Sequence, residues 1–410
     1  MTTPFNYLPP LSAGPGLRML EDVTVIDLTT SVAGPYATQL LADMGADVIK
    51  IEKKPDGDDS RAWGPPFLRG DSLWNLSVNR NKQSVTLDVG RDEGRAVLHD
   101  LLEKADVLVV NLGSRVQQKL GIDFARLSAK YPRLIHVSLT GFGLLGKRHD
   151  LPCYDLIAEG YSGVMDMTGE PENGPQKIGT PAADLLAGQD AAMAALAALY
   201  ERQRTGRGKQ IDISMVRTMT RFMSPRIIPY LGSGEVTRRA GGRDSVIAIY
   251  QVFETADQPL TLGLGNNAIW SRFWTAVGDP EFGAQPTYVS NESRRGCRKE
   301  IVARIAAILQ GKGRDEWLAL FARERIPAGP INRLDEVVRD PELLEEGLFY
   351  QADTNSGSVP QVGLGIAFDG ELAVHRMPPP ALGQHTQSVL QTRLGMEPAR
   401  IDALRTAGII

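Results

Sequence analysis

The sequence predicts an α/β fold with a largely parallel sheet, followed by a second, smaller α+β domain. Two observations in the first half support this: short apolar runs alternate with helical patterns, and the first two runs lie close enough for a strand–helix–strand crossover. The apolar runs lack strict polar alternation, which is typical of strands covered by helices on both faces. The third observation is length, because 410 residues exceed what one hydrophobic core usually serves.

The first crossover begins with a strand expected over residues 23–28, a short β-rich run ended by polar residues. A helical pattern follows over 35–44 and stops at Gly45, and a second strand is expected over 47–52. Such a βαβ unit implies parallel strands and a right-handed crossover. The alternation then continues, with strands expected over 84–87, 106–110, 134–139 and 211–215 and helices over 93–103 and 184–202.

The alternation of strand and helix patterns ends after about residue 217. The stretch 217–242 is glycine-rich and has no clear periodicity. A hairpin-like pair (246–253 and 260–264) and two amphipathic helices (268–277 and 299–309) then indicate the smaller α+β domain. The region after it contains helices and a proline-rich segment. We therefore expect the domain boundaries to give the segments 1–220, 221–330 and 331–410.

Composition excludes several classes of protein. Lys and Arg number 45 against 49 Asp and Glu, without a long basic block, which argues against a protein whose main work is to hold nucleic acid. A content of 42% hydrophobic residues excludes disorder. The most apolar stretch, 191–200, is about half of the ~20 residues that a membrane span needs, so we expect no membrane contact. Two cysteines and no signal pattern at the N-terminus predict a cytoplasmic location.

Motifs for a metal or a bound cofactor are missing from the sequence. The turn after the first strand, residues 29–35, has one glycine, whereas the dinucleotide-binding loop needs three. The histidines show no metal-ligand spacing, and we expect each to be a surface residue or a hydrogen-bonded structural residue: His99, His136, His149, His375 and His385. We therefore predict neither a metal site nor a resident cofactor.

An ordered set of motifs opens the chain: DLT at 27–29, AGPYAT at 33–38 and LLADMGADVIKIE at 40–52. This set resembles the class III CoA-transferases, the family that contains formyl-CoA transferase, carnitine CoA-transferase and their racemase relatives. Further matches are spread over nearly the whole chain: GDDSR at 57–61, GPPF at 64–67, VNRNK at 78–82, ADVLV at 105–109, GFG at 141–143, TGRG at 205–208, IPAGP at 326–330 and ALGQHT at 381–386.

The resemblance implies a Rossmann-like large domain built from both chain ends, with the small domain inserted between them, and an interlocked homodimer. It also implies a catalytic carboxylate at Asp184. In the family this aspartate attacks an acyl-CoA thioester, becomes an aspartyl-CoA thioester through a mixed anhydride, and passes CoA to an acceptor carboxylate through a second anhydride. Coenzyme A is then a substrate, and no cofactor takes part.

Asp184 lies where the helical pattern begins, and its position alone favours a plain helix N-cap. The small residues around it, which include Ala183, Ala187 and Gly188, leave room for a bulky acyl-CoA and favour the nucleophile instead. A helix N-terminus favours the charged form of a carboxylate. The Gly188 N–H is a candidate donor to the developing oxyanion.

The resemblance also assigns residues that line the CoA site: Val32, Ala33, Lys53, Leu87, Asn111, Gly113, Lys119 and Tyr154. Lys119 stands where many family members have arginine. Arg80 and Lys82 are further candidates, because the phosphates of CoA attract cationic side chains.

Tyr154 distinguishes the two branches of the family. The racemases have a Gly-His-Asp sequence because moving an α-proton needs an acid and a base, whereas this chain has Cys153-Tyr154-Asp155. Tyrosine is a poor base at neutral pH, which favours the transferase. The α-methylacyl-CoA racemase and a non-catalytic CoA-binding protein remain as alternatives.

In the small domain, the loop around residues 239–243 matches a glycine-rich loop that covers the active site in related transferases. It supplies the substrate-pocket candidates Gly241, Gly242 and Arg243. Arg238, Arg239 and Arg243 are candidates to bind a second carboxylate, which favours dicarboxylic acids and succinyl-CoA as donor. The longer glycine run of some oxalate-specific members is missing, which disfavours oxalate.

Overall fold

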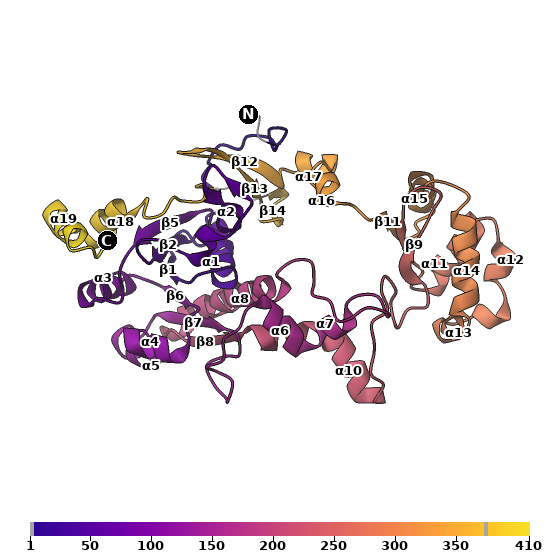
Figure 1. Ribbon diagram of the computed structural model, residues 1–410, viewed down its shortest axis with the longest axis horizontal. Coiled ribbons are helices and arrows are strands. Elements are labelled where there is room, and N and C mark those ends of the chain that lie inside the picture. Colours follow the sequence, from indigo (N-terminus) through magenta and orange to yellow (C-terminus); the bar gives the residue numbers. More distant parts are fainter. Residues whose placement is uncertain (1–3, 373–375) are drawn as a thin grey trace. The chain divides into compact units, whose positions relative to one another are not determined.

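The chain divides into two compact units, described separately below (Figure 1). The computed structural model describes residues 4–372 and 376–410, so His375 lies outside the described residues. The large unit contains residues 1–163, 178–224 and 338–410, and the small unit contains 164–177 and 225–337. The expected small domain, 221–330, did not include the segment 164–177, which groups with the small unit.

The large unit is built on a six-stranded parallel sheet in the order β5-β2-β1-β6-β7-β8. Its strands are β1 (Thr24–Leu28), β2 (Asp47–Glu52), β5 (Lys82–Thr86), β6 (Val107–Val110), β7 (Ile135–Thr140) and β8 (Gln210–Ser214). The order reverses between β1 and β6, which is the switch point where doubly wound folds bind ligands. This architecture confirms the predicted α/β class.

Helices cover both faces of this sheet. One face packs against α3 (Asp92–Leu102), α5 (Phe124–Lys130), α18 (Thr386–Leu394) and α19 (Pro398–Thr406) in one hydrophobic cluster. Because α18 and α19 lie near the C-terminus, the large unit contains both chain ends. The remaining helices are α1 (Ala33–Asp43), α4 (Ser114–Leu120), α6 (Asp155–Ser162), α8 (Ala182–Thr205) and α9 (Met215–Phe222).

Helix α8 packs against α1, β7, β8 and α9. A Cβ atom at Gly188 would lie 2.6 Å from the carbonyl oxygen of Ala33, so glycine allows α8 to approach α1 closely. Among the described residues, α8 is the one helix long and apolar enough to cross a membrane, and half of its most apolar window is buried. The helix expected over 184–202 is therefore present, and it begins two residues earlier and ends three residues later.

Short elements complete the large unit. The hairpin of β12 (Phe349–Thr354) and β13 (Gly357–Val362) was not expected from the sequence. The others are η1 (Asp59–Ala62), β3 (Phe67–Leu68), β4 (Asp71–Ser72), α2 (Leu73–Ser77), α17 (Pro341–Glu345), β14 (Ala367–Phe368) and β15 (Glu371–Leu372).

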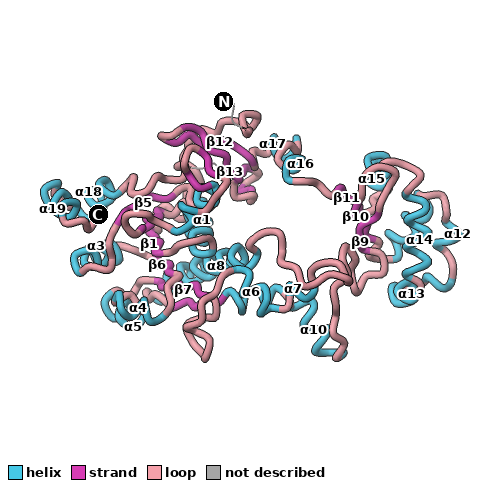
Figure 2. Tube along the Cα trace, viewed as in Figure 1, coloured by secondary structure: helices cyan, strands magenta, loops and turns pink. Residues whose placement is uncertain are grey.

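The small unit has a three-stranded antiparallel sheet in the order β11-β10-β9 (Figure 2). Its strands are β9 (Tyr250–Phe253), β10 (Leu260–Gly263) and β11 (Ala328–Pro330). The core is aromatic and contains Trp270, Phe273, Trp274, Tyr288 and Phe321. Its helices are α7 (Val164–Met167), α11 (Asn267–Ala276), α12 (Pro280–Gly283), η2 (Pro286–Tyr288), α13 (Asn291–Gly296), α14 (Arg298–Leu309), α15 (Arg314–Arg323) and α16 (Leu334–Val337).

Two expectations about this region were wrong. Residues 217–242 are not irregular throughout, since α9 and α10 (Ser224–Ser233) occupy much of the stretch. Helix α10 contains Pro229, and a proline inside a helical pattern indicates a helix end or a kink, so the sequence did not predict a helix here. The strand expected over 246–253 is regular only over its last four residues.

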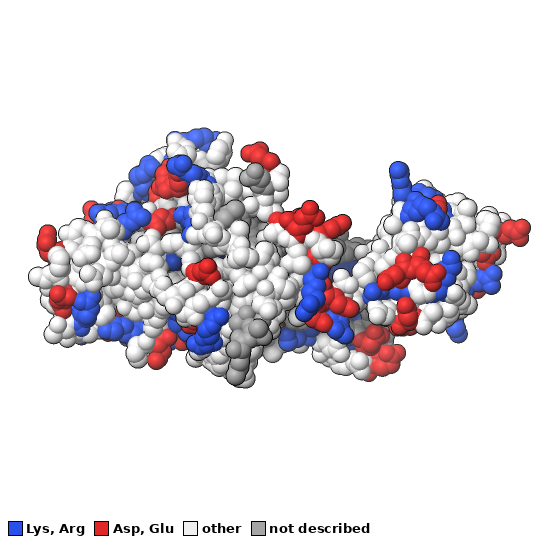
Figure 3. All heavy atoms as spheres, turned by 90° about the horizontal axis from the view of Figure 1, so that it is seen from above, with Lys and Arg blue, Asp and Glu red and all other residues white. Residues whose placement is uncertain are grey.

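On the face shown in Figure 3, acidic and basic side chains are interspersed.

Candidate active site

The carboxyl group of Asp184 lies at the N-terminus of α8, three residues after the N-cap Pro181. Asp184 is therefore not the cap that its position suggested. The capping acceptor comes from another helix: Oδ1 of Asp155, the first residue of α6, accepts hydrogen bonds from the N–H groups of Ala183 (2.8 Å) and Asp184 (3.3 Å). Asp155 thus satisfies helix donors that would otherwise lack partners and fixes the backbone of Asp184.

Burial dominates the electrostatics of Asp184. Burial, with a further contribution from the negative charge of Asp155, raises the pKa of Asp184 to about 7. The expected low hydration of this half-buried carboxyl group is present, but the expected preference for the charged form is not. Within the described residues, no hydrogen bond or ion pair engages the Asp184 side chain. Its oxygens are consequently available to a substrate.

Cys153 and Tyr154 precede Asp155 on the approach to α6. Burial, and then the charge of Asp184, raise the pKa of the Cys153 thiol to about 11, so this thiol is a poor nucleophile at neutral pH. Tyr154 is the N-cap residue of α6, and its side chain is 70% exposed. Gly188 lies inside α8, where its N–H belongs to the helix ladder, so the oxyanion role expected for it is wrong.

The loop between β1 and α1 is held by polar side chains from other elements. The side-chain amide of Asn111 exchanges two hydrogen bonds with the backbone of Thr30, at 2.8 and 3.1 Å. Oδ1 of Asp58 accepts from the Ser31 N–H at 2.9 Å, and the Lys50 ammonium donates to the Thr29 carbonyl at 2.9 Å. The loop therefore has a fixed backbone at the switch point of the sheet.

Lys82 and Arg80 belong to the protein interior, so their expected contact with CoA phosphates is wrong. The Lys82 ammonium is fully buried and donates to Asp27, Asn79 and the Pro35 carbonyl. Burial lowers the pKa of Lys82 to about 8. The Arg80 guanidinium is also buried and forms a two-point ion pair with Asp43. Lys82 is thus paired with Asp27 of β1, and Arg80 is paired with Asp43 of α1.

Two pockets open at the carboxyl ends of the strands. The first, of about 370 Å³, brings together Lys53 and Leu87 with the loop residues Thr29 and Thr30. The second, of about 390 Å³, is lined by Asn111, Gly113, Cys153 and other residues of the same edge. Val116 lines both pockets. The pockets thus extend from the predicted nucleotide side to Cys153, whose thiol pKa is raised by burial and then by the charge of Asp184.

Other predicted CoA-site residues lie away from these pockets. Val32 and Ala33 are buried where α1 begins. Lys119 is exposed on α4, and Tyr154 lines neither pocket. Lys53, by contrast, lines the first pocket, and its exposed ammonium pairs with Asp59 at 2.5 Å.

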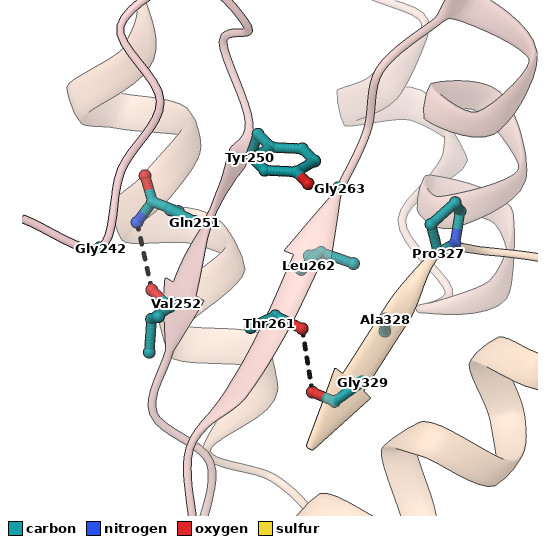
Figure 4. Close-up of a pocket in the computed structure, with 10 residues that line it drawn as sticks. All are labelled: Gly242, Tyr250, Gln251, Val252, Thr261, Leu262, Gly263, Pro327, Ala328 and Gly329. Atoms are coloured by element: carbon teal, nitrogen blue, oxygen red, sulfur yellow. Dashed lines mark hydrogen bonds between the residues drawn. The ribbon is translucent and has the colours of Figure 1, made fainter. Parts of the chain in front are cut away.

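The small unit has its own pocket of about 340 Å³ over its sheet (Figure 4). Gly242 lines it together with strand residues such as Tyr250 and Thr261. The Thr261 hydroxyl donates to the Gly329 carbonyl at 3.1 Å. Of the predicted substrate-pocket residues, Gly242 alone lines this pocket.

The neighbouring arginines have protein partners. Arg238 and Arg239 both pair with Asp166, at 3.4 and 3.0 Å, so a protein carboxylate occupies the guanidiniums that we expected to bind substrate. Gly241 has a positive φ of 60°, and a Cβ there would meet the Glu170 carboxylate at 2.2 Å. Arg243 Nε donates to the Ala240 carbonyl within the same loop.

Sequence reasoning missed Asp58 and Asp155 as site residues. Asp155 appeared only as part of a tripeptide that distinguishes two branches of a family. Its signal was an acidic residue at the start of a helical pattern, which is common at helix N-termini. Among the described residues, no group of three or more His, Cys, Asp or Glu side chains is placed to hold a metal ion.

A doubly wound sheet, pockets at its switch point and a half-buried carboxyl group whose charge acts on Cys153 of the second pocket define the class of protein as a ligand-binding α/β protein with a candidate nucleophile. The family model of CoA-transferase family III matches residues 20–386. The chain belongs to this family and is a class III CoA-transferase, which transfers CoA between an acyl-CoA and an acid.

Similar proteins cover nearly the whole chain. Succinate–glutarate CoA-transferase of Agrobacterium fabrum is 36% identical over 95% of this chain and 97% of its own. Succinyl-CoA:glutarate CoA-transferase of Mus musculus is 33% identical over 98% of this chain and 92% of its own. The crystal structure of a CaiB/BaiF family protein from Brucella suis is 33% identical and covers 92% of this chain and all of its own, with a TM-score of 0.80.

Proposed function

We propose that this enzyme moves CoA from succinyl-CoA to a dicarboxylic acid through covalent intermediates on Asp184. The observation that supports the nucleophile is the Asp184 carboxyl group itself, which is half-buried, has no protein partner within the described residues and has a pKa of about 7. A poorly solvated carboxylate is a better nucleophile than a hydrated one. At neutral pH a large fraction of Asp184 is ionised and able to react.

In the proposed reaction, a carboxylate oxygen of Asp184 attacks the thioester carbonyl of the donor, the C–S bond breaks, and CoA leaves as a thiolate. The thiolate attacks the aspartyl carbonyl of the resulting anhydride, which releases the donor acid and leaves an aspartyl-CoA thioester. The acceptor carboxylate then attacks this thioester and expels the thiolate again. Thiolate attack on the acceptor carbonyl gives the new acyl-CoA and restores Asp184, so no proton or water is consumed.

The choice of dicarboxylic acids rests on the relatives. Those from Agrobacterium fabrum and Mus musculus are named for succinate or succinyl-CoA and glutarate. A relative from Chloroflexus aurantiacus is named for succinyl-CoA and D-citramalate, and one from Haloarcula marismortui for succinyl-CoA and mesaconate. These acids share a second carboxylate. Arg243 forms no ion pair within the described residues, and we keep it as the candidate to bind that carboxylate.

Trapping on Asp184 tests the mechanism. The enzyme is incubated with succinyl-CoA and hydroxylamine, digested and analysed by mass spectrometry, and we expect a hydroxamate on Asp184. Asp184→Asn removes the nucleophile and should lose both the modification and turnover. Glu201→Gln is the matched control, because Glu201 is an exposed carboxylate on the same helix and pairs with Lys209. An unmodified Asp184 in an enzyme that turns over would refute the proposal, and α-proton exchange without transfer would indicate the racemase.

A donor–acceptor matrix tests the substrates. Succinyl-, acetyl- and formyl-CoA are each offered to glutarate, other dicarboxylates, oxalate and matched monocarboxylates. We expect succinyl-CoA with a dicarboxylate longer than oxalate to give the highest kcat/KM. An enzyme that prefers monocarboxylates would leave the transferase class intact and refute the dicarboxylate part.

We also propose that the protein is a cytoplasmic homodimer. The dimer follows from the family resemblance and the location from the sequence. Light scattering coupled to gel filtration should give twice the mass of 44.6 kDa.

A further inference from the structure

We infer that Asp155 is a positioning residue for the nucleophile: its carboxylate fixes the backbone of Asp184, and its negative charge favours the acylated forms of Asp184 over the free carboxylate. This inference rests on the proposed function. The geometry behind it is the pair of hydrogen bonds from the Ala183 and Asp184 amides to a single oxygen, Oδ1 of Asp155. Two N–H donors stabilise the negative charge of Asp155, so a charge stands beside the reacting group.

The consequence for the reaction follows from the charge of each state. Free Asp184 carries a negative charge, whereas the anhydride and the thioester at Asp184 are uncharged at that group. A neighbouring negative charge raises the free energy of the carboxylate and leaves that of the acylated forms nearly unchanged. Asp155 therefore favours acylation and makes Asp184 more nucleophilic, and the same effect raises the pKa of Asp184.

Among the described residues, Asp155 is the one charged group that raises the pKa of Asp184. Cys153 interacts with Asp184, but its raised pKa keeps the thiol uncharged at neutral pH. Tyr36 of α1 lies against Gly188, and burial raises its pKa, so it is also uncharged. Titratable groups on the elements packed against α8 have partners of their own: Glu159 with the Ile178 amide, Arg217 with Asp212, Arg221 with Asp190, Asp43 with Arg80, and His136 with the Ile122 carbonyl.

Substitution by asparagine separates the two roles of Asp155. Asp155→Asn keeps an oxygen that accepts the two amide hydrogen bonds and removes the charge. Asp155→Ala removes both. Asp123→Asn is the matched control, because Asp123 caps α5 through the Arg126 amide in the same unit.

Two readouts respond to the charge and not to a structural role. In Asp155→Asn, the acidic limb of the pH profile of kcat/KM should move to lower pH by about half a unit or more. Half a unit corresponds to about threefold, so the trapped fraction of Asp184 at pH 8 should fall by about threefold. The variant should thus become relatively more active at pH 5.5 while it loses activity at pH 8, and the control should match the wild type.

Each outcome supports or overturns the assignment. An Asp155→Asn enzyme with an unshifted acidic limb and normal trapping overturns it and leaves Asp155 as a helix cap. If Asp155→Asn does not fold, Asp155→Ser replaces it in the experiment, because serine is another neutral cap residue. If both neutral variants fail to fold while Asp155→Glu folds, the charge of Asp155 is needed for folding, and the assignment is likewise overturned. Absence of trapping in the wild type refutes the proposed function instead, so the two failures are distinguishable.

Discussion

Replacement of Asp184 by asparagine should abolish turnover and, at neutral pH, stabilise the protein. The reason is that burial raises the pKa of Asp184 from 3.8 to about 7, so the folded state holds a proton that the unfolded chain has released. A carboxyl group with a raised pKa destabilises the folded state progressively as pH rises from the unfolded value to the folded one. Asparagine is neutral at every pH and avoids this cost.

The size of the effect follows from the shift. The difference between 7 and 3.8 is about 3 pKa units, and at 1.36 kcal/mol per unit the upper limit is about 4 kcal/mol. Solvent reaches part of the half-buried side chain and screens its charge, so we expect about 2 kcal/mol. The advantage of Asp184→Asn should be near zero at pH 4, increase between pH 4 and 7, and level off above pH 7.

Urea denaturation followed by circular dichroism at pH 4, 5, 6, 7 and 8 measures this difference directly. Glu201→Gln is the control on the same helix, since an exposed ion pair contributes about 1 kcal/mol or less. A stability difference that is constant with pH, or that shrinks as pH rises, would refute the electrostatic account of Asp184.

Three further substitutions test the packing around the site. Gly188→Ala should destabilise the protein by about 1 kcal/mol or more and raise KM for acyl-CoA, because the new Cβ meets the Ala33 carbonyl oxygen at 2.6 Å. Urea denaturation measures the stability, and steady-state kinetics measure KM. The control is Gly232→Ala, which should not destabilise the protein because nothing lies within 4 Å of the added Cβ. Asn111→Ala removes the two hydrogen bonds that hold the loop after β1, so KM for acyl-CoA should rise about tenfold while kcat changes less. A tenfold fall in kcat with an unchanged KM would contradict this. Lys82→Met leaves a buried carboxylate of β1 without one of its cations and should cost about 3 kcal/mol in urea denaturation; a cost below about 1 kcal/mol would contradict the ion pair's role.

The local pattern of apolar residues was sufficient to predict those helices and strands whose structure depends mainly on their own residues. The crossover of β1, α1 and β2 was expected within a few residues, because buried parallel strands and a helix that packs on them leave apolar runs and periodicity in the sequence. The hairpin of β12 and β13 escaped this reasoning, because Pro360 lies inside its second strand and a proline within a short run argues against a strand. The motifs assigned Asp184 and the family, and the comparisons confirm the family.

The sequence by itself determined the α/β class, the family and the candidate nucleophile. Tertiary structure alone decided the surroundings of that nucleophile: Asp155 reaches the Asp184 amide across 29 residues, Asn111 reaches Thr30 across 81, and Lys82 reaches Asp27 across 55. These contacts carry no local signature, because hydrogen bonding and burial depend on which distant segments the fold brings together. The same reason explains why the sequence located the Asp184 carboxyl group and gave the wrong sign for its preference between the charged and neutral forms.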